Sequence, residues 1–136
     1  MFISETKIRV RYAETDKMGY VYYGNYAQYY EVGRVEALRF LGVSYKALED
    51  KGVMLPVVHL NINFKKPAFY DDELTIRTII KEMPDTKMKF YYEIYNDNKL
   101  LINQGETILV FVHHQTMKPC HCPQWFRDLF DIFDLL

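Results

Sequence analysis

The sequence predicts an α+β protein in which one antiparallel β-sheet wraps around a single long helix. Only residues 24–41 show a sustained helical repeat of apolar positions in the body of the chain. Four β-rich segments follow this helix and are separated by short turns. Strands and helices do not alternate along the chain, which disfavours a doubly wound parallel sheet.

Residues 5–12 form the first predicted strand. Two sets of side chains alternate there, Thr6, Ile8, Val10 and Tyr12 against Lys7, Arg9 and Arg11. Successive side chains of a strand point to opposite faces, so this alternation is typical of a half-buried strand. No period fits residues 14–19, where we expect a turn that contains Gly19 after Asp16.

The long helix is predicted from about Gly24 to Leu41. Its apolar positions recur at helical spacing as Tyr26, Tyr30, Gly33, Ala37, Phe40 and Leu41. Gly42 stands where a C-terminal glycine would end the helix. A second, shorter helix is expected from Ser44, as its N-cap, to Gly52. Apolar residues cover more of the long helix than is usual for a surface helix, so we expect the sheet to enclose it.

The remaining strands are predicted at residues 53–64, 73–81, 87–95 and 100–114. Turn signals at Pro84-Asp85 and at Asn96-Asp97-Asn98 separate the later ones. Gly105, inside the last strand, predicts a bulge or bend. From Pro123 onward, aromatic and leucine residues at helical spacing, the last of them Phe133, predict an amphipathic helix whose end the spacing does not fix.

Composition and charge narrow the possible function classes. We expect the 136 residues to form one domain, residues 1–136. Seventeen basic and 18 acidic residues give a net charge of -1, which provides no global field for nucleic acid or an anionic membrane. The first ten residues lack signal-peptide features, and no apolar run reaches the roughly 18 residues of a membrane span, so a cytoplasmic protein is expected. Cys120 and Cys122 cannot supply a disulfide framework.

One acidic residue, Asp16, stands a few residues before the start of the long helix. The N-terminus of a helix offers unpaired backbone N–H groups and about half a unit of positive charge. Acyl transfer needs this pairing, because one group attacks or deprotonates while another holds the oxyanion. An aspartate next to glycine is also a common turn residue, so the pattern alone leaves both interpretations open.

The order of elements around this turn resembles the hot dog fold, and more narrowly the 4-hydroxybenzoyl-CoA thioesterase family of acyl-CoA thioesterases. The residues that carry the resemblance are Arg9-Val10, Thr15-Asp16, Gly19, Val21-Tyr22, Asn25-Tyr26 and Glu31-x-x-Arg34, followed by residues 64–74. The likeness covers most of the chain up to about His114. The first block is long and irregularly spaced, so chance explains it poorly.

The resemblance implies that Asp16 acts as nucleophile or general base on a thioester, and that the backbone N–H of Tyr23 polarises its carbonyl. It implies an acyl-CoA substrate, no metal or redox cofactor, and a homodimer or homotetramer whose sheets join edge to edge. Tyr20 departs from the family pattern, which has a smaller aliphatic residue there, and this affects the shape of the acyl pocket.

Two other functions stay open: hydrolysis of acyl carrier protein thioesters, and non-catalytic binding of an acyl thioester. A hot dog dehydratase would need a histidine near the helix, and none precedes Gly52.

Several other residues are of types that could bind phosphate, act as a catalytic acid or hold a metal ion. Lys87 and Lys89 lie near the turn where the family places its nucleotide contacts, and they are the predicted substrate-binding lysines, although Lys65 and Lys66 also suit phosphate. Solvated lysines at strand edges explain all four equally well. Glu31 and Glu36 are rival catalytic acids. Arg34 follows Glu31 by one helical turn and both glutamates lie on the polar stripe, so a structural ion pair or a solvated helix face is the simpler interpretation. A last group, His113, His114, Cys120, His121 and Cys122, matches zinc spacing poorly, so no metal site is predicted.

Overall fold

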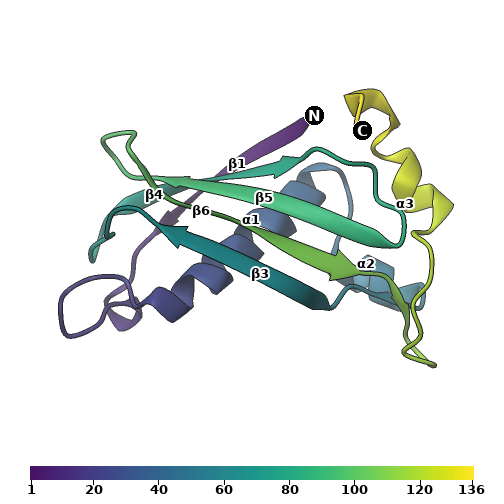
Figure 1. The fold of residues 1–136 in the computed structure, drawn as a ribbon, viewed down its shortest axis with the longest axis horizontal. Helices are drawn as coiled ribbons and strands as arrows, with labels where there is room; N and C mark the ends of the chain where they lie inside the picture. The colour runs from purple at the N-terminus through teal and green to yellow at the C-terminus, as the bar shows by residue number, and fades with distance from the viewer.

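The computed structural model describes all residues from Met1 to Leu136 (Figure 1). Its strands are β1 (Phe2–Arg9), β2 (Val53–Met54), β3 (Val57–Phe64), β4 (Glu73–Ile80), β5 (Lys87–Tyr95), β6 (Leu101–Val110) and β7 (Val112–His113). Its helices are α1 (Tyr26–Phe40), α2 (Tyr45–Asp50) and α3 (Gln124–Asp128). Short 3-10 turns lie at Tyr12–Glu14, Tyr23–Asn25 and Asp131–Phe133.

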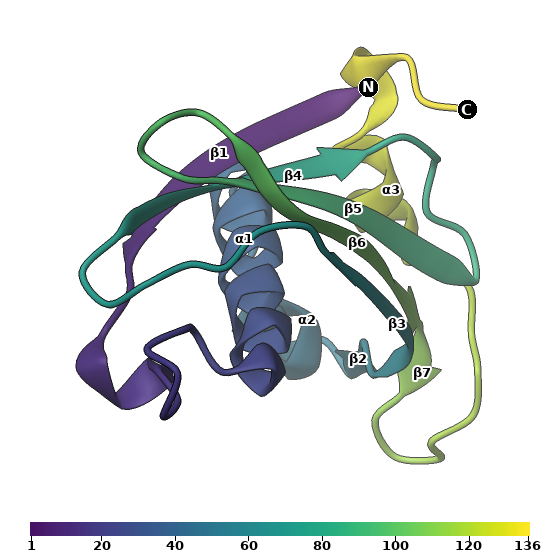
Figure 2. The same ribbon diagram turned by 60° about the vertical axis from the view of Figure 1, so that its left-hand side comes forward.

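Five strands form one sheet in the order β1-β4-β5-β6-β3, and every neighbouring pair is antiparallel. The sheet curves over α1, which lies against its inner face (Figure 2). Strands β2 and β7 form a separate two-stranded pair. The predicted α+β class, with about five strands around one central helix, is therefore confirmed.

The core lies between α1 and the inner face of the sheet. Every second residue of β5 is buried, and these residues are Met88, Phe90, Tyr92 and Ile94. Tyr30 of α1 is fully buried and stacks on Tyr92, with ring centroids 4.2 Å apart. Its hydroxyl donates a hydrogen bond to the buried Asn103 of β6. The polar ends of these tyrosines are thus satisfied inside the core, as burial requires.

The predicted ends of the short helix are confirmed. Ser44 Oγ accepts a hydrogen bond of 3.0 Å from the Ala47 N–H, as an N-cap does. Gly42 and Gly52 both have a φ of +85°, the left-handed conformation that glycine adopts beyond a helix end.

The first predicted strand is partly wrong. β1 begins earlier, at Phe2, and ends at Arg9, whereas Tyr12 starts a 3-10 turn and is 77% exposed. Beyond Val10 local contacts dominate, because the Arg11 N–H donates to the Glu14 carboxylate at 2.9 Å and the Glu14 N–H donates to the Arg11 carbonyl at 2.9 Å. The period of two therefore continues in the sequence after the strand has ended.

Gly105 does not mark the predicted bulge. The register of β6 with β3 and β5 runs through Gly105 without interruption, and the shifts lie at Val57/His59 and Ile94/Tyr95 instead. A Cβ at position 105 would overlap the Asn61 carbonyl oxygen and lie 2.6 Å from the Tyr30 hydroxyl. The glycine is therefore explained by close packing between α1, β6 and β3.

The predicted C-terminal helix is present, and the structure fixes its end. α3 ends at Asp128, and the chain then turns back to the sheet, where the Met83 N–H donates to the Leu136 carbonyl at 2.8 Å. Phe126 and Phe130 are fully buried in the core. Backbone pairing with residues 81–83 thus competes with continuation of the helix, and the tail closes one end of the core.

None of the helices combines the length and the apolar character that crossing a membrane would require.

Candidate active site

The loop that carries Asp16 is a tight hairpin. Thr15 bridges to Val21, and the Asp16 N–H donates to the Tyr20 carbonyl at 2.8 Å. The Gly19 N–H donates back to the Asp16 carbonyl at 2.9 Å, and Gly19 has a φ of +84° that favours glycine. The predicted glycine-containing turn is therefore confirmed, and it fixes the backbone of Asp16.

The Asp16 carboxylate is held by one oxygen and free at the other. Its Oδ1 accepts hydrogen bonds from the Met18 N–H at 2.9 Å and the Tyr20 N–H at 3.2 Å. No group of the chain donates to Oδ2. The carboxylate is half-buried, so its orientation is set by the loop while Oδ2 stays available to a bound molecule.

The chain enters α1 through the 3-10 turn at Tyr23–Asn25. The Tyr22 N–H donates to the Glu14 carbonyl and the Asn25 N–H to the Tyr22 carbonyl, both at 2.9 Å. The N–H groups of Tyr23 and Gly24 have no acceptor within the chain. Two donors are therefore left free at the entrance to α1, as expected for the first turn of a helix.

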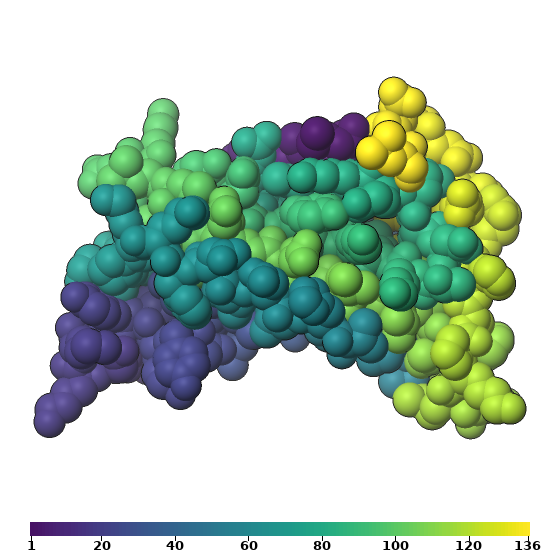
Figure 3. Space-filling view, viewed as in Figure 1, coloured from purple at the N-terminus to yellow at the C-terminus, as the bar shows by residue number.

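Asp16 and Tyr23 lie on the wall of the same pocket, which we name the Asp16 pocket and which measures about 280 Å³. Its other lining residues are Met18, Tyr20, Val21, Tyr26, Phe64, Lys65, Lys66 and Pro67. In Figure 3 the indigo atoms of the first loops lie directly beside the teal atoms at the end of β3. The two predicted catalytic residues therefore line the same, mainly apolar pocket, together with two lysines.

Aromatic contacts set the shape of this pocket. Tyr26 packs edge-on against Phe64, with ring centroids 5.5 Å apart, and joins α1 to the end of β3. Tyr20, the residue that departs from the family pattern, packs edge-on against Phe69 at 5.4 Å. Burial raises the pKa of Tyr26, so its hydroxyl stays protonated and brings no second negative charge next to Asp16.

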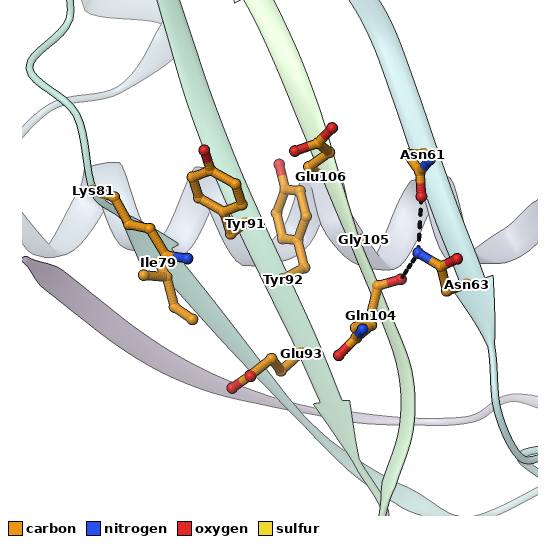
Figure 4. Close-up of a pocket in the computed structure, with 10 residues that line it drawn as sticks. All are labelled: Asn61, Asn63, Ile79, Lys81, Tyr91, Tyr92, Glu93, Gln104, Gly105 and Glu106. Carbon is orange, nitrogen blue, oxygen red and sulfur yellow. Dashed lines mark hydrogen bonds between the residues drawn. The ribbon is translucent and has the colours of Figure 1, made fainter.

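A larger hollow of about 370 Å³ lies on the outer face of the sheet (Figure 4). It contains three carboxamides, from Asn61, Asn63 and Gln104, and two carboxylates, from Glu93 and Glu106. Both carboxylates already face basic groups, Arg77 at 3.6 Å and His59 at 3.4 Å. Asn63 donates to the side chain of Asn61 at 2.8 Å. This hollow contains none of the predicted catalytic residues, and its polar groups are largely paired with one another or with neighbours. It is therefore a poorer candidate site than the Asp16 pocket.

Lys87 and Lys89 lie on this outer face, away from the Asp16 pocket. Phe64 of β3 is opposite Asn103, which is opposite Ile94 of β5. Lys89 and Lys87 precede Ile94 by five and seven residues, or roughly 17 and 24 Å along the strand. Within one chain the structure does not bring them to Asp16, and their role stays a prediction.

Glu31 and Glu36, the two alternative catalytic acids, do not line the Asp16 pocket. Glu36 pairs with Arg39, and Glu31 lies 3.9 Å from Arg34 with 66% of its side chain exposed. Arg34 itself is buried, with 8% exposure, although the sequence indicated it only as an ion-pair partner of Glu31. Its position four residues after Tyr30, on the buried stripe of the helix, was a signal that could have revealed this.

The histidines and cysteines near the C-terminus do not converge. No three ligand-type side chains of the whole structure lie close enough together to hold a metal ion. His121 lies 2.9 Å from the Asp85 carboxylate. Burial raises the pKa of the Cys122 thiol to about 12, which makes it a poor nucleophile.

The family model of the thioesterase-like superfamily matches residues 10–130. The acyl-CoA thioester hydrolase YbgC of Escherichia coli O157:H7 is 36% identical over 117 residues, which are 86% of this chain and 87% of that protein. The DHNA-CoA thioesterase structure from Staphylococcus aureus is 38% identical with a TM-score of 0.90, over 98% of this chain and 89% of that one.

A structure of 4-hydroxybenzoyl-CoA thioesterase in complex with 4-hydroxybenzoyl-CoA is also similar, with a TM-score of 0.83 over 93% of this chain and 97% of that one. At 21% identity it supports the fold alone. The predicted resemblance to hot dog fold thioesterases is confirmed by these matches.

Proposed function

The chain belongs to the thioesterase-like superfamily, and from this premise we propose that it hydrolyses acyl-CoA thioesters to a free acid and CoA. One observation supports the proposal: a single pocket is lined by Asp16, whose Oδ2 accepts no hydrogen bond within the chain, and by Tyr23, whose N–H donates none. The relatives named as acyl-CoA thioester hydrolase and DHNA-CoA thioesterase support this substrate class. We take residues 1–136 as the catalytic domain.

In the proposed reaction the thioester carbonyl oxygen accepts a hydrogen bond from the Tyr23 N–H. Asp16 Oδ2 then either attacks the carbonyl carbon or removes a proton from the attacking water. In both routes the bond from carbon to sulfur breaks, the thiolate of CoA leaves, and water supplies the new oxygen and the proton. The free N–H stabilises the developing oxyanion, a contribution typically worth about 10²–10³ in rate.

A thiol-release screen tests this function. Acyl-CoA thioesters of increasing chain length, aryl-CoA thioesters and acyl carrier protein thioesters are supplied in turn, and the free thiol is measured. We expect turnover of CoA thioesters. Turnover of carrier-protein thioesters alone would instead favour the second predicted substrate, and binding without release from any thioester would favour a non-catalytic module.

Substitution of Lys65 and Lys66 and substitution of Lys87 and Lys89 test two different proposals for CoA binding through KM. Lys65 and Lys66 line the Asp16 pocket, so we propose that they attract the CoA phosphates as point charges. The double variant Lys65→Gln/Lys66→Gln should raise KM about 3- to 10-fold with little change in kcat, because exposed charge pairs contribute about 0.2–1 kcal/mol each. Steady-state kinetics at low salt provide the measurement.

Lys87→Gln/Lys89→Gln is the matched comparison, since it removes the same charge from the outer face of β5. The predicted nucleotide contacts of Lys87 and Lys89 are retained as a proposal in which they act on CoA bound at a neighbouring subunit. The KM of this double variant should then rise in the oligomer. A KM equal to that of the parent would remove both lysines from the substrate site.

We also propose that the chain works as a homo-oligomer joined through β3. This strand lies at the edge of the sheet, pairs only with β6 and exposes Val57, Val58, Leu60 and Phe64 by 44–57%. An exposed apolar edge is a template for pairing with another strand. A second copy that adds its own β3 would cover it and extend the Asp16 pocket.

The mass in solution tests this assembly. Light scattering should give twice the chain mass, or four times for a tetramer, and Val58→Lys should shift the protein to a single chain. Val32→Lys is the control, because Val32 is an exposed apolar residue of α1 outside the sheet edge. A parent protein that is monomeric at the concentrations used in the assay would contradict the proposal.

A further inference from the structure

A third cavity, of about 300 Å³, lies between α1 and the inner face of β3. We name it the Arg34 hollow, and its walls are formed by Ala27, Gln28, Glu31, Arg34, Val57, Leu60 and Thr107. The Asp16 pocket uses the start of α1 and the last residue of β3. The Arg34 hollow is lined by residues 27–34 of α1, after Tyr26, and by Val57 and Leu60 of β3, before Phe64. The two cavities therefore succeed one another along the same side of the helix.

A buried guanidinium lines this hollow. Arg34 is only 8% exposed, and its Nε donates to the Tyr45 hydroxyl at 3.1 Å. The one carboxylate within ion-pair distance is Glu31, 3.9 Å from Nη2, and the Glu31 side chain is 66% exposed. The counter-charge of Arg34 is therefore distant and largely solvated.

The other groups around Arg34 do not supply a negative charge. Burial raises the pKa of Tyr45, and it raises the pKa of Tyr92 to about 12, so both hydroxyls are neutral near pH 7. The Tyr92 hydroxyl is shared with Thr107 at 2.6 Å. Buried charges in proteins are normally paired closely, because desolvation is costly otherwise. Arg34 thus retains capacity for an anion that enters the hollow.

We propose that Arg34 determines acyl specificity by binding a carboxylate at the remote end of the acyl group. This inference rests on the proposed thioesterase function, with the thioester held at Asp16 and Tyr23. Eleven residues separate Tyr23 from Arg34, or about 16 Å along the helix axis. Helical side chains lean toward the N-terminus, which shortens this gap. Ala27, Val57 and Leu60 supply apolar walls for the carbon chain between the two ends.

Length-matched pairs of CoA thioesters test the proposal. Succinyl-, adipoyl-, suberoyl- and sebacoyl-CoA are compared with butanoyl-, hexanoyl-, octanoyl- and decanoyl-CoA. At the length that spans the two cavities, the carboxylate-terminated member should have a kcat/KM at least about tenfold higher, since a hydrogen bond to a charged group is typically worth about that much. Arg34→Met should abolish this preference while plain acyl chains are still hydrolysed.

Glu31→Gln tests the same site without touching the buried arginine. It removes the neighbouring carboxylate that repels an incoming one, so it should increase the preference for carboxylate-terminated thioesters. Glu36→Gln is the matched control, because Glu36 belongs to the same helix but lines neither cavity, and its ratio should equal that of the parent. Because Glu31 is exposed, this variant provides a result even if Arg34→Met fails to fold.

Equal kcat/KM within every pair would overturn the proposal. A preference for carboxylate-terminated thioesters that survives in folded Arg34→Met would also overturn it, and so would one that Glu31→Gln leaves unchanged. A purely structural role of Arg34 would lower the Tm of Arg34→Met without altering the ratio. Calorimetry on Asp16→Asn measures the affinities for the same pairs, and so gives the binding selectivity without turnover. Selective binding combined with no thiol release from any substrate would contradict the proposed function while supporting this inference.

Discussion

Asp16→Asn should lower kcat at least ~100-fold and leave the fold intact, because the variant loses a nucleophile or general base. Asparagine keeps an Oδ1 acceptor for the N–H groups of Met18 and Tyr20, so the hairpin loop can retain its geometry. The amide nitrogen would replace Oδ2, which accepts no hydrogen bond from the chain. Thiol release by purified protein, together with Tm, provides the measurement.

The control is Asp72→Asn, since Asp72 also caps a turn. Its Oδ2 accepts a hydrogen bond from the Phe69 N–H at 2.9 Å, and it does not line the Asp16 pocket. This variant should have a kcat close to that of the parent. Near-parent turnover in Asp16→Asn would rule out Asp16 as the nucleophile or general base, whereas equal losses in both variants would indicate a role in the loops alone.

The parent enzyme can also separate the two chemical routes. In a single turnover in water enriched in heavy oxygen, a covalent acyl-aspartate hydrolysed at the Asp16 carbonyl would leave the isotope in Asp16. General-base catalysis would put it only in the released acid. Isotope found by mass spectrometry in the peptide that contains Asp16 therefore identifies Asp16 as a nucleophile. An unlabelled peptide excludes hydrolysis at the Asp16 carbonyl and leaves general-base catalysis or water attack on the acyl carbon.

Local signals predicted the parts of the site that depend on a few neighbouring residues. The turn after Asp16, the end of α1 at Gly42 and the cap at Ser44 each follow from backbone preferences within one or two turns. The family motif added roles for Asp16 and Tyr23. The structure then placed both on one pocket, which the sequence could only imply.

Contacts between distant segments could not be read from the sequence. Tyr26 and Phe64 meet across the pocket because β3 forms the sheet edge, which depends on the strand order β1-β4-β5-β6-β3. The same order places Lys65 and Lys66, just after β3, at the pocket, whereas the alternation along β5 places Lys87 and Lys89 on the outer face. The family resemblance instead favoured Lys87 and Lys89 for substrate binding.

Gly105→Ala should destabilise the protein by more than about 3 kcal/mol, a large part of the roughly 5–15 kcal/mol typical of a domain. The added Cβ would overlap the Asn61 carbonyl oxygen, which belongs to the backbone of β3 and cannot rotate away. It would also lie 2.6 Å from the hydroxyl of the fully buried Tyr30. Relief requires β3 to separate from β6. Urea unfolding followed by circular dichroism measures the loss.

Gly33→Ala is the matched control for this packing argument. Its Cβ would meet only side chains, Thr78 Oγ1 at 2.5 Å and Ile76 Cγ2 at 2.8 Å, and alanine gains about 1 kcal/mol over glycine in a helix. Its loss of stability should therefore be smaller. Because β3 also carries Phe64 and the lysines of the Asp16 pocket, any Gly105→Ala protein that still folds should lose kcat/KM as well. A variant as stable and active as the parent would show that α1, β6 and β3 do not constrain one another at this point.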